Sequence, residues 1–187
     1  MYHGLFLMGH LNKGGIGMAI GDLLSKARKR QGMTQEDLAA DVNYSREAIA
    51  KYETGARKLP KELYQEVTLS VDDPQFYFET WEAASGVVSI PYFDGDYIDP
   101  HPASMHYLVR KETTEALEQL NSVCWVKPAN VRTEDEREEM KKVLMEVLDA
   151  AASMINLVAC VCKEYRFSMK DIFRAWNVTM KIRKFNK

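Results

Sequence analysis

The chain has 187 residues, of which 46% are hydrophobic, 28% charged and 10% aromatic, a composition typical of globular proteins and unlike disordered, fibrous or membrane ones. The formal net charge is -2, so attraction to nucleic acid or anionic lipid has to come from a local patch. Cys124, Cys160 and Cys162 have no paired spacing, which disfavours a disulfide framework or a metal site and favours a reducing, cytoplasmic location.

We do not interpret the first residues of the chain as a signal peptide. Residues 1–17 hold only a brief apolar patch, Leu5 to Met8, followed by histidine and glycines. Lys13-Gly14-Gly15 can be encoded by a ribosome-binding sequence, and Met18 follows after a short spacer. We expect residues 1–17 to be a disordered extension or the product of a mis-assigned start codon. No apolar run reaches the roughly 18 residues of a membrane helix, so no membrane segment is expected.

Helical periodicity dominates the rest of the chain, which predicts an all-α fold. Gly32 and Gly55 are predicted to end helices, and Asn43 to supply a left-handed turn. Residues 86–102 contain three prolines and are predicted to form a loop with a short extended piece at 87–90. The expected helices cover about 20–31, 34–42, 45–54, a segment from about 60, 73–84, 103–123, 133–165 and 168–181.

Residues 34–53 have the pattern of a helix-turn-helix. Thr34 with Asp37 predicts a capping box, and Ala39 is small where two short helices would cross. Apolar anchors follow at Leu38, Val42, Ile49 and Tyr52. With these anchors inward, the second helix presents an outward face on which a DNA major groove would lie, formed by Ser45, Arg46, Glu47 and Lys51.

The stretch from Ile20 to about Leu69 resembles the five-helix Cro/cI-type (XRE-like) DNA-binding domain, a lambda-repressor-like fold of phage repressors and bacterial regulators. The one departure is Asn43, where glycine is common, and asparagine tolerates the same backbone conformation. The features that carry the resemblance are Thr34-Gln35, Leu38-Ala39, Ile49 with Tyr52-Glu53, and Gly55 followed by Arg57-Lys58 before Pro60.

The resemblance implies roles for individual side chains. It implies that Arg28 and Glu53 form an interhelical ion pair and that Gln35 contacts a DNA phosphate, although Gln35 could instead only cap its helix. Arg57 and Lys58 follow the recognition helix and are expected to contact phosphates, with plain surface charge as the alternative. The residues expected to read DNA bases are Tyr44, Ser45, Arg46 and Glu47 at the start of the recognition helix, together with Lys51 on its outward face.

Residues 70–109 hold seven acidic residues, no Lys or Arg, and many aromatic residues. Residues 70–102 are expected to be a connector whose aromatics fill a core, or else part of a surface for a protein or small-molecule effector within 70–109. The polar residues Asp94, Asp96, Asp99, His101 and His106 match no metal-binding spacing, so neither a metal nor another cofactor is expected.

Residues 103–187 are expected to form a helical dimerisation or effector region. A wide apolar stripe runs along 133–165, and we expect it to pack within its own bundle and to form part of a homodimer. Ser168 and Asp171 predict a capping box, and the basic tail after it is a further candidate DNA contact. The stripe consists of Met140, Leu144, Val147, Ala151, Met154, Val158, Val161 and Tyr165, widened by Leu148, Ile155 and Cys162.

These features predict a sequence-specific, double-stranded DNA-binding transcriptional regulator of repressor type that acts as a dimer on a palindromic operator. The alternative is a protein-interaction protein, such as an antitoxin or phage-encoded inhibitor, that reuses the helix-turn-helix fold. An enzyme is disfavoured because the sequence shows no nucleophile elbow, phosphate loop, metal-ligand spacing or poised carboxylate pair.

Overall fold

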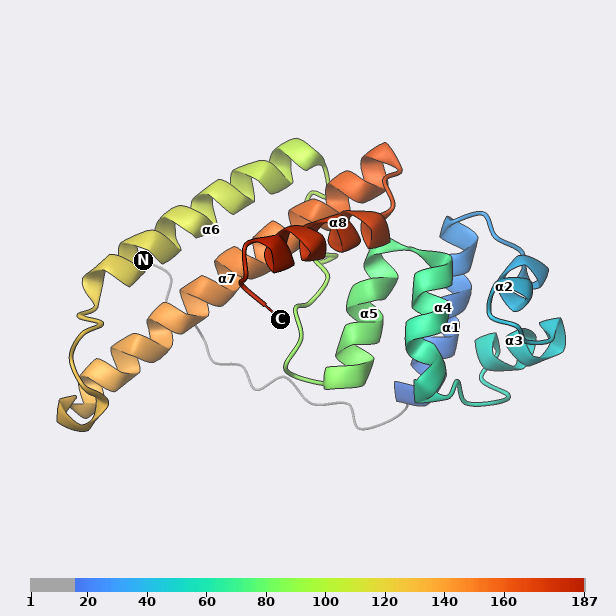
Figure 1. The fold of residues 1–187 in the computed structure, drawn as a ribbon, viewed down its shortest axis with the longest axis horizontal. Helices are drawn as coiled ribbons and strands as arrows, with labels where there is room; N and C mark the ends of the chain where they lie inside the picture. The colour runs from blue at the N-terminus through green and yellow to red at the C-terminus, as the bar shows by residue number, and fades with distance from the viewer. Residues whose placement is uncertain (1–15, 187) are drawn as a thin grey trace.

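The computed structural model describes residues 16–186, and over that range it contains helices and no strand, which confirms the all-α prediction (Figure 1). A helix-turn-helix end and a long helical hairpin lie at opposite ends of the molecule. The α-helices are α1 (Ile16–Arg30), α2 (Gln35–Asp41), α3 (Arg46–Glu53), α4 (Tyr64–Val71), α5 (Pro74–Ser85), α6 (Pro102–Ser122), α7 (Glu134–Tyr165) and α8 (Met169–Ile182), with short 3-10 turns at Lys61–Leu63 and Ala129–Val131. The proposed N-terminal extension lies outside the described residues except for its last two, which belong to α1.

The turns of the N-terminal part follow the local sequence signals. Thr34 accepts a hydrogen bond from the Asp37 amide while the Asp37 carboxylate accepts one from the Thr34 amide, so the predicted capping box is present. Asn43 adopts the left-handed conformation at φ 52°, and the Gly55 φ is 72°. Ser45 caps α3 by accepting a hydrogen bond from the Ala48 amide. These groups fix where each short helix begins and ends.

One apolar core holds the N-terminal helices together, and it extends past the expected boundary at residue 69 into α5. Its buried residues come from α1 to α5, with the fully enclosed Phe76 closing it on the α5 side. Gly21 on α1 lets α3 come close, because a Cβ there would lie 2.0 Å from the Tyr52 carbonyl oxygen. The core is built from Ile20, Leu24, Ala27, Leu38, Ala39, Val42, Ile49, Tyr52, Leu59, Leu63, Tyr64, Val67, Val71 and Phe76.

The connector between α5 and α6 has no extended piece at 87–90. Those residues form turn and bend, and Val87 and Val88 are exposed, so the expectation of a short strand there is wrong. Asn156 on α7 fixes the next part of the connector. Its side-chain oxygen accepts a hydrogen bond from the Phe93 amide at 2.9 Å, and its nitrogen donates to the Pro91 carbonyl at 3.0 Å. The connector therefore relies on a buried amide instead of on sheet pairing.

Helices α6 and α7 run side by side as an antiparallel hairpin, and α8 crosses α7 (Figure 1). The expectation that the apolar stripe of α7 packs within its own bundle holds only in part. Cys162 is buried, and Ile155 and Val158 pack against the cluster at α8. The large stripe residues Leu144, Leu148 and Met154 are exposed. Most residues on the buried face of α7 are small or polar, and small side chains let neighbouring backbones come close. Among them, the Ser153 hydroxyl donates to the Ala150 carbonyl at 2.8 Å. That face comprises Val143, Ala150, Ala152, Ser153, Asn156, Ala159, Cys160 and Cys162.

Helix α7 is also long and apolar enough to cross a membrane, by length and composition alone. The sequence pattern predicts no membrane segment there. In the structure α7 packs along α6, and its Asn156 bonds to the connector. We therefore interpret α7 as a core helix of this fold.

Candidate nucleic-acid interface

The second helix of the helix-turn-helix, α3, has one buried and one exposed side. Ile49 and Tyr52 are enclosed in the core at 0% and 1% exposure. The five residues expected to read bases all lie outward: Tyr44, Ser45, Arg46, Glu47 and Lys51 are exposed. Of these, Tyr44 also packs its ring edge against Tyr52, with 6.3 Å between centroids. The exposed side of α3 and of the turn before it therefore carries polar and aromatic side chains.

Arg46 is held by a carboxylate from the neighbouring helix. Its Nε lies 2.8 Å from Glu36 Oε1, and both side chains are more than half exposed, at 56% and 64%. An ion pair this exposed contributes about 0–1 kcal/mol to stability. Arg46 can therefore leave Glu36 for another acceptor at little cost.

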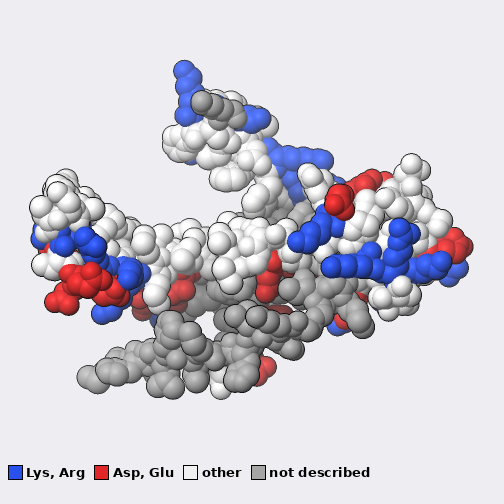
Figure 2. All heavy atoms as spheres, turned by 90° about the horizontal axis from the view of Figure 1, so that it is seen from below, with Lys and Arg blue, Asp and Glu red and all other residues white. Residues whose placement is uncertain are grey.

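The loop after α3 carries two exposed cations. The Arg57 amide donates to the Lys51 carbonyl at 2.9 Å, and the Arg57 guanidinium lies 5.5 Å from the centroid of the Tyr52 ring. Lys58 is exposed beside it. Seen from below, basic side chains gather over the helix-turn-helix end of the molecule and at the projecting end of α8 (Figure 2). This local charge is what a protein of net charge -2 needs to approach DNA.

Gln35 is half-buried at the start of α2 and has a role that the sequence did not reveal. Its side-chain nitrogen donates to Glu53 Oε2 at 2.9 Å. The cap of α2 is Thr34, so Gln35 is not the capping residue. Gln35 therefore links the start of α2 to the end of α3.

Arg28 and Glu53 lie together between α1 and α3, as the resemblance implies. Arg28 Nε is 2.6 Å from Glu53 Oε1 and Arg28 Nη2 is 2.9 Å from Glu53 Oε2, with both side chains buried. Ser25 adds a third donor at 3.1 Å. Burial alone would raise the pKa of Glu53, but the hydrogen bonds from Arg28 and Gln35 outweigh it and hold that pKa below its usual value. Glu53 thus fixes α3 against both α1 and α2.

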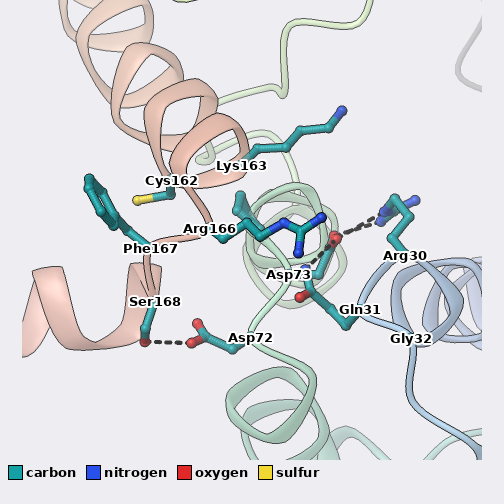
Figure 3. Close-up of a pocket in the computed structure, with 11 residues that line it drawn as sticks. Arg30, Gln31, Gly32, Asp72, Asp73, Cys162, Lys163, Arg166, Phe167 and Ser168 are labelled. Atoms are coloured by element: carbon teal, nitrogen blue, oxygen red, sulfur yellow. Dashed lines mark hydrogen bonds and ion pairs between the residues drawn. The ribbon is translucent and has the colours of Figure 1, made fainter.

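A pair of consecutive aspartates forms the joint between the N-terminal helices and α8 (Figure 3). Asp73 accepts two hydrogen bonds from Arg30, at 2.6 and 2.9 Å, and caps α5 by accepting one from the Phe76 amide. Asp72, at φ 49°, accepts hydrogen bonds from Ser168 Oγ at 2.5 Å and from the Lys170 amide at 3.1 Å. Asp73 therefore holds the end of α1, while Asp72 holds the beginning of α8.

A cavity of about 660 Å³ opens at this joint, and Lys163 and Arg166 from the end of α7 lie on it (Figure 3). The sequence predicts a helix start at Asp73 and no role for Asp72. The signal that was available is the Asp-Asp-Pro sequence itself, because two adjacent carboxylates before a helix exceed what one cap requires.

The separate acids and histidines of the connector do not gather: Asp99 accepts hydrogen bonds from the His101 amide and from Ser104.

Three carboxylates do come together on the hairpin, at Glu112, Glu146 and Asp149. Burial and the nearby negative charges raise the pKa of Glu146 and of Asp149. Lys111 lies 2.9 Å from Glu112 and 3.0 Å from Glu115, which compensates part of the charge. The group is an acidic cluster of the hairpin, and no further observation associates it with a ligand.

Comparison with known families agrees with this geometry. Residues 24–66 match the family model described as helix-turn-helix, which covers α2, α3 and the helices on either side in part. No curated protein and no solved structure gave a match. The matched segment contains the capped α2, the left-handed Asn43 and the outward face of α3. Residues 24–66 therefore form a helix-turn-helix domain, in agreement with the resemblance to the Cro/cI type, and this is the kind of domain with which transcription regulators bind DNA.

Proposed function

We propose that the protein is a sequence-specific regulator of transcription, of repressor type, that binds double-stranded DNA as a homodimer in the cytoplasm. One observation carries the proposal: α3 buries Ile49 and Tyr52 completely and leaves Arg46, Glu47 and Lys51 outward beside the cations of the following loop. That arrangement fits a recognition helix in the major groove with phosphate contacts at its flank.

In this proposal the side chains divide into two groups. Arg46 gives up Glu36 and donates to the O6 and N7 acceptors of a guanine, with Tyr44, Ser45, Glu47 and Lys51 against neighbouring bases. Gln35, Arg57 and Lys58 contact phosphates. The Gln35 bond to Glu53 and the stacking of Arg57 on Tyr52 support this, because both side chains are held in place before DNA arrives.

The homodimer is proposed from the apolar side chains that the C-terminal helices leave exposed. Leu144, Met145 and Leu148 on α7 are each more than half exposed, and α8 buries only Met169 among its fourteen residues. Its Ile172 and Trp176, one turn apart, are also exposed. Short helices are marginally stable in water without tertiary packing. The exposed Ile172 and Trp176 of α8 therefore favour a dimer in which a second copy of the chain covers them. Sedimentation of the full chain at micromolar concentration is expected to give the mass of a dimer.

The decisive experiment compares a base contact with a phosphate contact. Duplexes bound by the wild-type chain are first selected from a random-sequence pool, and scrambled duplexes of equal composition serve as non-specific DNA. Arg46→Ala is expected to cost about 1–3 kcal/mol on the selected sequence and little on scrambled DNA, because only the selected sequence offers the guanine contact. Lys58→Ala is expected to weaken both duplexes alike and to lower the slope of log affinity against log salt by about one.

The readout is fluorescence anisotropy over a salt series, and Lys141→Ala on the hairpin is the matched control. Lys141 pairs with Glu138 near the beginning of α7, at the end of the molecule away from the helix-turn-helix, and its substitution is expected to change neither affinity nor salt slope. If the wild-type chain binds all duplexes equally weakly, the regulator proposal is wrong and a protein partner takes the place of DNA.

A further inference from the structure

A second, largely apolar groove of about 620 Å³ lies between α4, α5, α7 and α8, away from the outward face of α3. Its base is the small buried cluster of Phe78 and Met169 with Ile155 packed against it. Aromatic side chains from two different helices line the groove, Tyr77 and Trp81 from α5 and Phe173 from α8. The groove has the size and lining of a small-molecule site.

Apart from the Tyr77 hydroxyl, which bonds to Asp72, the polar side chains of this groove are two cations and two neutral amides. They are Gln65, Lys170, Arg174 and Asn177, and no Asp or Glu lines the groove. Lys170 Nζ donates to the Leu69 carbonyl at 3.0 Å and lies 4.0 Å from Asp72 Oδ2, so its charge is partly compensated within the chain. Arg174 bonds to Asp171 at 3.2 Å, but both side chains are about two-thirds exposed, so that bond is weak. An apolar groove edged by two cations and two amides is complementary to an apolar molecule with a negative end.

We propose that this groove binds a small amphipathic acid, with an aliphatic or aromatic body against Tyr77, Trp81 and Phe173 and a carboxylate at Arg174. The amide of Asn177, one turn along α8, is a second donor for the same carboxylate. The site is distinct from the DNA surface and from the acidic cluster on the hairpin.

Helix α8 can serve this ligand and a second copy of the chain at once. Met169, Phe173 and Asn177 follow one another at four-residue spacing and line the groove. Ile172 and Trp176 form the adjacent row, and neither of them lines it. One row of α8 thus faces the ligand, and the other remains for association.

The groove is connected to the joint that holds α8. Tyr77 donates from its hydroxyl to Asp72 at 2.8 Å, and Asp72 in turn accepts the hydrogen bonds from Ser168 and Lys170 at the start of α8. A ligand between Tyr77 and Phe173 therefore stabilises α8 in one position relative to α4 and α5. An effect of the ligand on DNA affinity rests on the function proposed above, whereas its binding does not.

The test titrates the full chain, without DNA, with octanoate and with octan-1-ol, which has the same chain length and no charge. Calorimetry is expected to show octanoate binding more tightly than octan-1-ol. Arg174→Gln is expected to weaken octanoate about tenfold and to leave octan-1-ol unchanged. Arg183→Gln, at the end of the same helix and outside the groove, is the control and is expected to change neither.

Three outcomes would overturn the proposal: no saturable octanoate binding, equal affinity for octanoate and octan-1-ol, or equal effects of the two arginine substitutions. A fluorescence-anisotropy titration of selected duplexes with and without octanoate then tests regulation separately. If octanoate binds but DNA affinity does not change, the ligand site stands and its coupling to DNA is refuted. If no duplex is bound specifically, the proposed function fails while the ligand site is still judged by calorimetry.

Discussion

The two ends of this molecule build their interiors in different ways. Among the described residues, the N-terminal helices enclose fourteen apolar side chains in one cluster, whereas the cluster beneath α8 has only four fully buried members. At the same time the long hairpin and α8 expose Leu144, Leu148 and Trp176. The difference teaches that the helix-turn-helix end is complete by itself, while the C-terminal helices present apolar surface that favours a partner.

Buried polar groups differ in the same way between the two ends. The N-terminal domain encloses a charged pair, Arg28 on α1 and Glu53 on α3. The C-terminal helices bury neutral groups instead, and Asn156 and Ser153 bond to backbone atoms. Charge thus fixes the position of α3, whereas an amide attaches the connector to α7.

The largest expected effect comes from breaking the charged pair. Glu53→Gln leaves Arg28 buried without a compensating charge, and we expect it to lower the free energy of unfolding by about 3 kcal/mol. Glu36→Gln breaks the exposed pair with Arg46 and is the matched control, with an expected cost of about 0–1 kcal/mol. Chemical denaturation of both variants measures the two values. Equal losses would show that the Arg28 and Glu53 pair is no better protected from water than the pair on the surface.

The same substitution has a pH dependence with a definite sign. The pKa of Glu53 is lower in the folded than in the unfolded chain, so its contribution to stability is present above the unfolded pKa and is lost as the pH falls through the folded value. The stability gap between wild type and Glu53→Gln is therefore expected to be widest near neutral pH and to narrow in acid.

A smaller effect is expected at the C-terminal end from Asn156→Ala. The substitution leaves the Phe93 amide and the Pro91 carbonyl without their side-chain partner, which costs about 1–3 kcal/mol for buried groups. Limited proteolysis within 86–101 is expected to become faster, because the connector loses its attachment to α7. Ser153→Ala, which removes a bond inside the same helix only, serves as control. Unchanged proteolysis in Asn156→Ala would show that the connector is held by its aromatic packing.

The exposed face of α7 offers the most direct test of the contrast between the two ends. Leu148→Glu places a charge on a residue that is 62% exposed, so the monomer is expected to keep its stability. If a second copy covers this face, self-association is expected to weaken tenfold or more, about 1.4 kcal/mol, in sedimentation equilibrium. If Leu148→Glu alters neither mass nor stability, the partner surface lies elsewhere. Gln119→Glu, at an exposed position of α6, adds the same charge and is the control.

Much of the N-terminal domain follows from local sequence signals. Thr34, Asn43 and Gly55 each act within a few residues, and the structure has the turns that they predict. The close approach of α1 at Gly21 and the bond from Gln35 to Glu53 depend on how whole helices cross, so no local pattern reveals them.

The error on α7 has a physical cause. Periodicity identifies the most apolar face of a helix, and a prediction from it assumes that the most apolar face is also the most buried one. In the structure the hairpin and the connector pack against small residues such as Ala150 and Ala159, because small side chains let backbones approach. Large apolar residues were left exposed, and that observation could come only from the three-dimensional arrangement. The exposed side of α3, by contrast, can be predicted from the sequence, because it consists of the residues that remain once Ile49 and Tyr52 are assigned to the core.

The smallest expected effect concerns the acidic cluster, where the hairpin holds negative charge that is only partly compensated, unlike the paired charges of the N-terminal core. The pKa of Asp149 is raised in the folded chain, first by burial and then by Glu112, so the folded state favours the protonated carboxyl. Stability is therefore expected to rise as the pH falls through that raised pKa and to be reduced above it. Asp149→Asn removes the like-charge repulsion and is expected to stabilise the chain near neutral pH by roughly 0.2–0.5 kcal/mol, the size of an exposed helix pair. Denaturation at neutral pH and in acid measures it, and the gain is expected to vanish in acid. If Asp149→Asn instead destabilises the chain at neutral pH, the carboxylate of Asp149 makes a stabilising contact that outweighs the repulsion from the nearby carboxylates.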